Sequence, residues 1–395
     1  MLNFLKSALY WFFGLGVIFL PVSYFLLPDR NSVNRWLFGP IITWLSDLLF
    51  GVEGPDLNFY SDSISMFLLF ILLAVLSIAI GLLSQFQILR WLADSTVRHV
   101  FQSLMIWFLA FQLFSYGIDK LFLGQFYTPF SNILMRPFGQ LDRDILYWSV
   151  MGLSPIYSYF LGAMEVIGAL LVLFYRTRVI GLYISFAMLL NIVMINFGFD
   201  ISVKLVSSFL LALNLTLLFP HLKRLLYAVS TGIPLDLKDI DHLSKIVSNQ
   251  SVKLSTRMIA IALLISEGMG LQLSQGFSKE KPELYAYEVV YAQPDTDFEA
   301  AVFLFIHPDG YLIYHDKLGH SKSVKIIMEK HESGIEFIVD KVEGNYYLIR
   351  DMSNEFIFTH DGSVLCSGKV HRLEDWPALQ SKFHWFMEDV GTVAN

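Results

Sequence analysis

Residues 196–211 read NFGFDISVKLVSSFLL, an apolar segment that nevertheless holds Asp200 and Lys204 four positions apart. Side chains at positions i and i+4 share one face of a helix and can form an ion pair. Asp200 would also be stabilised near the N-terminal end of a helix by the helix dipole. We therefore predict a membrane-spanning helix over residues 200–220 whose first turn carries an Asp–Lys pair.

The composition of the whole chain is typical of a membrane protein. Of its 395 residues, 55% are hydrophobic and only 16% are charged, whereas soluble proteins carry about 25% charged residues. A net charge of -7 without clusters of Lys and Arg argues against a nucleic-acid partner. Cys366 is the single cysteine, which excludes an intramolecular disulfide and a cysteine-based metal site.

Seven segments are long and apolar enough to cross a bilayer, which takes about 20 residues. The first is too long for a signal-peptide core, so we interpret it as an uncleaved span. Two further pieces, residues 34–51 and 136–152, suit short interfacial or re-entrant helices, the former because Gly39 and Pro40 interrupt it. The predicted spans are residues 4–27, 64–88, 100–123, 155–175, 177–197, 200–220 and 257–275.

The basic residues of the short loops predict the orientation of the spans. They follow the second, fourth and sixth spans, which assigns these loops to the cytoplasm. The N-terminus is then cytoplasmic, and the seventh span delivers residue 276 onward to the outside. The basic residues are Arg90, Arg98, Arg176, Arg178, Lys223, Arg224, Lys238, Lys245, Lys253 and Arg257.

Residues 283–368 change to short segments rich in Tyr, Phe, Ile and Val. Turn signals such as PDG at 308–310, EGN at 343–345 and HDG at 360–362 separate them. This pattern predicts an antiparallel all-β domain of about eight strands, either a barrel or a sandwich. Residues 374–390 predict a terminal helix with Pro377 in its first turn.

Ionisable and amide side chains recur inside the predicted spans, where each charge costs about 2.5–3.5 kcal/mol. The third span ends in a Tyr-Asp-Lys group, and Glu165 and Glu267 lie near the centres of the fourth and seventh spans. By the predicted topology most of these groups meet in the outer half of the membrane. The candidate catalytic residues are Glu165, Lys120 and Lys204, and the candidate ligand-binding residues are Tyr116, Asp119, Asn191, Asn196 and Asp200.

A purely structural interpretation competes with this site. Asp119 and Lys120 suit an end-of-helix pair whose lysine reaches the headgroups, and Asp200 with Lys204 suits polar contacts that hold spans together. The histidines of residues 283–395 lack the spacing of metal ligands, so we interpret them as turn and surface residues and predict no metal site. Hydrolase, P-loop and dinucleotide-binding motifs are also missing from the sequence.

Residues 147–211 and the run YGIDKLFLGQF at 116–126 resemble the DoxX-like membrane proteins of bacteria, in particular a longer subgroup with an outer C-terminal domain. The marks that carry the resemblance are Gly162, Glu165, Gly168, Arg176, Arg178, Gly181, Asn191, Asn196 and the FDxxVK run that ends in Lys204. The resemblance implies a bacterial inner-membrane location and a four-helix core over residues 100–225. Some relatives are tied to quinone-linked sulfur oxidation or thiol-redox complexes, which implies partner subunits. A more distant similarity to the membrane domain of vitamin K-dependent carboxylases is also present.

The sequence therefore predicts a membrane all-α bundle followed by a β-rich domain. Its first functional hypothesis is a polar intramembrane pocket near the outer leaflet that binds a quinone or another lipid-soluble redox ligand as part of an oxidoreductase complex. The alternatives are a non-enzymatic anchor that presents the β-rich domain, or a transporter or proton path. The expected divisions are residues 1–99 (two spans and an interfacial helix), 100–225 (four-helix core), 226–256 (cytoplasmic linker), 257–275 (seventh span) and 276–395 (extracytoplasmic domain).

Overall fold

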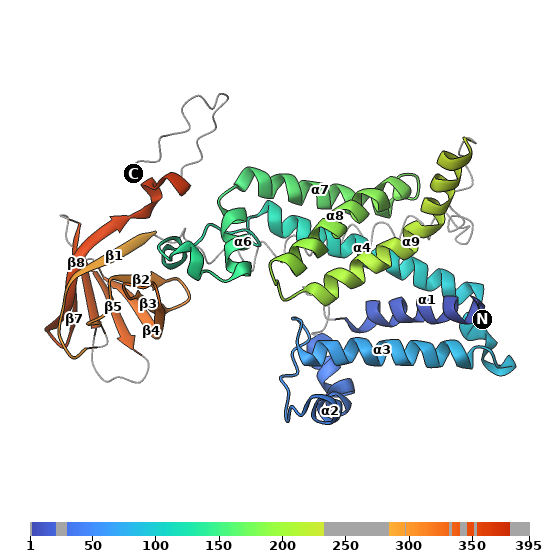
Figure 1. Cartoon of the computed structure of the whole chain (residues 1–395), viewed down its shortest axis with the longest axis horizontal. Helices are drawn as coiled ribbons and strands as arrows, with labels where there is room; N and C mark the ends of the chain where they lie inside the picture. Colours follow the sequence, from blue (N-terminus) through green and yellow to red (C-terminus); the bar gives the residue numbers. More distant parts are fainter. Residues whose placement is uncertain are drawn as a thin grey trace. The chain divides into compact units, whose positions relative to one another are not determined.

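The computed structural model (Figure 1) describes residues 2–20, 30–232, 284–296, 298–331, 334–339, 346–350 and 354–379. They divide into two compact units. The helical unit contains the described parts of residues 1–125 and 158–278, and the strand unit contains those of residues 126–157 and 279–395.

The helical unit is built from long apolar helices. Among the described residues, five segments are long and apolar enough to cross a membrane, and each overlaps one of the predicted spans. Gln87–Leu121 begins well before the predicted span at 100–123, and Lys204–Thr231 continues well beyond the predicted span at 200–220. Residues 4–19 form a shorter apolar helix, and the predicted span at 257–275 lies outside the described residues. The helices are α1 (Leu2–Phe19), α2 (Arg30–Phe50), α3 (Ile64–Leu83), the short 3-10 helix η1 (Gln87–Ala93), α4 (Ser95–Leu121), α7 (Pro155–Leu173), α8 (Arg178–Gly198) and α9 (Lys204–Thr231).

The predicted interruption of residues 34–51 at Gly39 and Pro40 is wrong, because α2 is continuous through both residues. A proline inside a helix removes one backbone hydrogen bond, and here the helix tolerates that loss. Some polar side chains of α2 are buried against the protein: Asn34 donates to the carbonyl of Phe19 at 2.7 Å and is fully buried, and Asn31 and Ser46 are buried as well. Large apolar side chains are exposed instead, with Trp36 at 81%. This inverted polarity suits a helix in contact with lipid.

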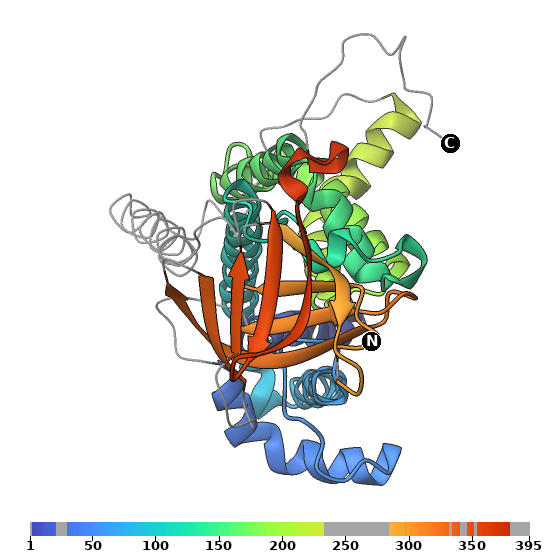
Figure 2. The same cartoon turned by 90° about the vertical axis from the view of Figure 1, so that its left-hand side faces the viewer.

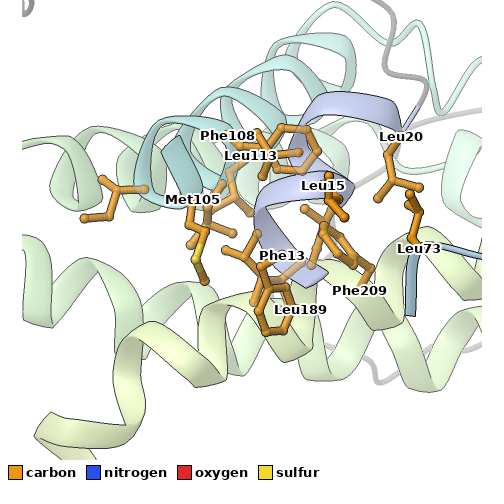
Figure 3. Close-up of a cluster of buried hydrophobic side chains, with 14 of the residues drawn as sticks. Phe13, Leu15, Leu20, Leu73, Met105, Phe108, Leu113, Leu189 and Phe209 are labelled. Carbon is orange, nitrogen blue, oxygen red and sulfur yellow. The ribbon is translucent and has the colours of Figure 1, made fainter. Parts of the chain in front are cut away.

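An aromatic cluster ties the helical unit together (Figure 3). The ring of Phe209 on α9 lies 5.4 Å from that of Phe13 on α1, 5.9 Å from Phe70 on α3 and 6.3 Å from Phe108 on α4. A Cβ at Gly16 would come within 2.4 Å of the Phe209 ring, so only glycine permits this approach. One side chain therefore connects four helices.

The strand unit is an eight-stranded antiparallel barrel, which decides between the two predicted architectures (Figure 2). Each strand pairs with the next, and β1 pairs with β8, so the hydrogen-bonded ring closes. Gly310 and Gly362 have positive φ values in two of the predicted turns. The strands are β1 (Tyr285–Ala292), β2 (Phe303–His307), β3 (Tyr311–His315), β4 (Ser321–His331), β5 (Gly334–Val339), β6 (Tyr346–Arg350), β7 (Glu355–His360) and β8 (Ser363–Arg372).

The interior of the barrel is filled by its own side chains. Buried residues such as Leu304, Leu348, Phe356 and Phe358 form one apolar cluster. Where its side chains are described, the interior of the barrel is therefore a packed apolar core. After β8 the structure describes two 3-10 turns, η5 (Leu373–Asp375) and η6 (Pro377–Leu379), and the rest of the predicted terminal helix lies outside the described residues.

Residues 126–157, which the sequence assigned to the four-helix core, belong to the strand unit. They form α5 (Ser131–Leu134), η2 (Phe138–Gln140) and α6 (Arg143–Gly152). The ring of Phe130 lies 4.5 Å from that of His307 on β2, and the Gln140 amide donates to the carbonyl of Leu318. The connection between α4 and α7 is thus packed on the barrel.

Candidate functional site

A buried ion pair joins α4 to α7. The Nζ atom of Lys120 lies 2.9 Å from Oε1 and 2.8 Å from Oε2 of Glu165. Only 6% of the Lys120 side chain and 2% of the Glu165 side chain are exposed. Two opposite charges at this distance offset part of the cost of removing each from water, so the structure brings together two of the three predicted catalytic residues.

Small residues permit this approach of the helices. A Cβ at Gly162 on α7 would lie 2.6 Å from the carbonyl oxygen of Gly117 on α4, and a Cβ at Gly117 would lie 2.8 Å from the carbonyl oxygen of Gly162. Close backbone contact through small residues is a common way to pack helices in membranes. A Cβ at Gly117 would also lie 3.0 Å from the Cβ of Glu165, and a Cβ at Gly162 would lie 3.0 Å from the backbone nitrogen of Leu121, so each glycine lies against the part of the other helix that carries one member of the ion pair.

Tyr116 lies beside the ion pair, as predicted. Its ring centroid is 5.7 Å from the Lys120 Nζ atom, a cation–π distance. Tyr116 is 39% exposed, so it lies between the buried charges and the surface of the helical unit. The neighbouring Asp119 helps to end α4, because its carbonyl accepts the N–H of Gly124 at 2.8 Å.

Lys204 takes part in a different ion pair, so the structure does not support a single cluster of all the predicted residues. Its Nζ atom lies 2.7 Å from Asp200 and 3.8 Å from Asp62. The Asp62 carboxylate also accepts the backbone N–H groups of Lys204 at 2.7 Å and Leu205 at 2.9 Å. A residue just before α3 therefore caps the N-terminus of α9 and supplies acceptors that this terminus lacks.

Sequence reasoning missed Asp62. The run YSDSIS offers the signal of a helix start, with Ser63 as the N-cap of α3, but it gives no sign that the adjacent carboxylate caps another helix. The predicted Asp–Lys pair forms, but the prediction that both residues lie in the first turn of one helix is wrong, because α9 begins at Lys204 and Asp200 lies before it with a φ of 56°.

The two predicted asparagines have different surroundings. Asn196 is buried, and its side-chain amide donates to the Ser207 hydroxyl at 2.9 Å, which links α8 to α9. Asn191 is exposed on α8 and contributes nothing to the Lys120–Glu165 pair in this geometry. Glu267 lies outside the described residues.

One curated relative shares part of this chain. It is the protein named "Uncharacterized protein YwoB" from Bacillus subtilis (strain 168), 34% identical over 121 residues that make up 28% of this chain and 71% of YwoB. The chain belongs to the YwoB family. The name of YwoB states no activity, so belonging to the YwoB family assigns no function to this chain. No family model matches the sequence, and no solved structure matches it.

The positions of the histidines in the structure test the prediction that they are turn and surface residues without a metal site. Within the described part of the chain, no group of three or more His, Cys, Asp or Glu side chains is arranged to hold a metal ion. The interpretation of all the histidines as turn and surface residues is wrong for His315, which is 2% exposed on β3. Burial and the nearby Arg136 lower the pKa of His315 from 6.5 to about 4. Its Nε2 atom has no hydrogen-bond partner in the part of the chain that the structure describes.

Proposed function

We propose that this chain is a multi-pass protein of a bacterial inner membrane whose Lys120–Glu165 pair binds a lipid-soluble ligand through a carbonyl oxygen. A quinone is the first candidate, and a partner subunit would exchange electrons with it in an oxidoreductase complex. The observation that carries the proposal is the buried ion pair between α4 and α7, in which the Lys120 ammonium group contacts both carboxylate oxygens of Glu165.

The chemistry of the pair supports a ligand with a carbonyl group. An ionisable residue at membrane depth is costly, and such residues commonly mark a functional site. The ammonium group of Lys120 can donate a hydrogen bond to a carbonyl oxygen, and the carboxyl group of Glu165 can hold or release a proton beside it. The partly exposed Tyr116 ring offers a route to the pair from the surface of the helical unit.

The connectivity of the strand unit supports the proposed orientation. Residues 126–157 and the barrel share one compact unit, so both must lie on the same side of the membrane. The predicted topology places the connection between α4 and α7 outside, which puts the barrel outside as well. The predicted span at 257–275, which would bring the chain to that side, lies outside the described residues.

Quinone binding by the purified protein in lipid nanodiscs tests the proposal. We expect Lys120→Met and Glu165→Gln each to weaken binding about tenfold or more, the value of a lost charge-assisted hydrogen bond. Lys204→Met is the matched control, because it removes a lysine of the other ion pair. Wild-type protein that binds no quinone, or unchanged affinity in both variants, would eliminate this function.

The second candidate is a non-enzymatic anchor that presents the barrel to an extracytoplasmic partner. The observation that favours it is an apolar strip on the outer face of neighbouring strands, where Ile349 on β6 pairs with Ile357 on β7 and both are nearly half exposed. Ile349→Lys with Ile357→Lys would abolish partner capture if the anchor is the function, and would leave quinone binding unchanged if the membrane site is. The predicted proton path ranks third, since its second glutamate, Glu267, lies outside the described residues.

A further inference from the structure

A cavity of about 600 Å³ lies in the helical unit, at the opposite end of α4 from the Lys120–Glu165 pair. Side chains from α1, the end of α3, η1 and the first turns of α4 line it. Arg98 and Lys120 are separated by roughly 30 Å along α4, given a rise of 1.5 Å per residue. The cavity is therefore distinct from the proposed ligand site.

The charge of the cavity is positive. Lys6, Arg90 and Arg98 line it, together with a single acidic residue, Asp94. None of the three cations forms an ion pair within the part of the chain that the structure describes. Three basic side chains from three different elements thus line one hollow that contains a single carboxylate, so the lining keeps an excess of positive charge.

A buried hydroxyl also lines this cavity. Ser7 on α1 is 8% exposed, and its Oγ atom has no hydrogen-bond partner among the described residues. A buried polar group without a partner costs free energy that a bound acceptor would recover. Its presence beside the three cations indicates a place for an anion with oxygen atoms.

The segment that carries Arg90 also exposes large apolar side chains, which do not line the cavity but suit contact with lipid. On η1, Ile88 is 89% exposed and Trp91 is 60% exposed, and Phe86 just before it is 65% exposed. Tryptophan is enriched where proteins cross the boundary between lipid and water. The indole of Trp11 donates to the carbonyl of Leu92 at 2.9 Å, which holds η1 against α1.

We propose that this cavity binds a phosphate-bearing anion, supplied by the headgroup of an anionic phospholipid. Basic pockets between membrane helices at the cytoplasmic side are suited to such headgroups, and the basic loops predict that side for Arg90 and Arg98. A cavity of this size holds a headgroup, while the exposed apolar side chains of the neighbouring segment, Phe86, Ile88 and Trp91, offer contact for acyl chains. A free phosphate would share the cations but would gain nothing from these apolar side chains.

Native mass spectrometry of the detergent-solubilised protein tests the site, with three separate additions: a short-chain phosphatidylglycerol, a short-chain phosphatidylcholine and inorganic phosphate. We expect retention of phosphatidylglycerol above phosphatidylcholine. Arg90→Gln with Arg98→Gln should weaken that binding roughly thirtyfold, since each basic residue near anionic lipid contributes about fivefold. Arg176→Gln with Lys223→Gln removes the same charge from exposed positions outside the cavity and should change the binding little.

A second variant keeps the test decisive if the arginine variant fails to fold. Ser7→Ala removes the buried hydroxyl without changing charge, so the ligand-free protein should be at least as stable as the wild type while phosphatidylglycerol binds more weakly. Binding of inorganic phosphate that displaces the lipid would support the anion site and assign it to a soluble phosphate. Equal binding of phosphatidylglycerol and phosphatidylcholine, or equal losses in the cavity and control variants, would overturn the proposal.

Discussion

Lys120 and Glu165 lie 45 positions apart in the chain, and both carboxylate oxygens of Glu165 lie within 2.9 Å of the Lys120 ammonium nitrogen. Removal of one member leaves the other charge buried and unpaired, which costs about 3–5 kcal/mol. We expect Lys120→Met and Glu165→Gln to lower the free energy of unfolding by that amount, and the double variant to recover a large part of the loss. Chemical unfolding in micelles measures all three. Additive losses in the double variant would contradict a direct pair.

The glycine contact between α4 and α7 predicts a second effect. Gly162→Ala places a Cβ 2.6 Å from the Gly117 carbonyl oxygen, so the helices must separate. We expect a lower melting temperature and loss of the quinone affinity that the intact pair supports. Gly198→Ala is the matched control, because a Cβ at that position meets nothing within 4 Å. Equal melting temperatures of the two variants would show that the contact is dispensable.

The cap that Asp62 provides for α9 predicts a moderate loss of stability. Asp62→Ala removes the acceptors of two backbone N–H groups and should cost about 1 kcal/mol, the usual value of a helix N-cap. Asp62→Asn keeps one acceptor and should cost less. Asp200→Asn serves as the control, since its carboxylate is 78% exposed and asparagine tolerates the positive φ at this position. Equal denaturant midpoints of Asp62→Ala and Asp200→Asn would contradict a stabilising cap at Asp62.

His315 predicts a dependence of barrel stability on pH. Its pKa is about 4 in the folded protein and 6.5 ordinarily, so the unfolded chain binds more protons between these values. The neutral ring of His315 therefore makes its full contribution to the free energy of unfolding above pH 6.5, and this contribution is lost as the pH falls towards 4. Calorimetry of the full-length protein between pH 4 and pH 8 should show this slope reduced in His315→Gln and retained in the exposed His320→Gln. Identical slopes in both variants would assign the effect to other groups.

The helices and strands were largely predictable because their signals are local. The predicted span at 64–88 contains α3, and the predicted β region 283–368 contains β1 to β7 and the first part of β8. The predicted span at 200–220 stopped too early, since α9 continues through Pro220 to Thr231 and ends at Gly232 in the left-handed conformation. Hydropathy marks the part of a helix that lipid can cover, and it does not mark the polar turns that extend the helix.

The site was less predictable because ion pairs depend on contacts between distant segments. Glu165 and Lys120 stood out from the sequence by their charge in apolar surroundings. Asp62 did not, because 142 positions separate it from the backbone N–H of Lys204 that it caps. His315 looked like a surface residue for the same reason: the segment that comes to lie near it contains Arg136, far away along the chain.

The sequence alone determined the class of this protein: apolar helices for a membrane and alternating strands for an antiparallel domain, because solvent preference and backbone propensity are properties of neighbouring residues. Only the tertiary structure decided which charges meet, how residues 126–157 join the barrel, and that the barrel closes. The physical reason is that electrostatic and packing energies fall off within a few ångströms, and the chain sets those distances only when it folds.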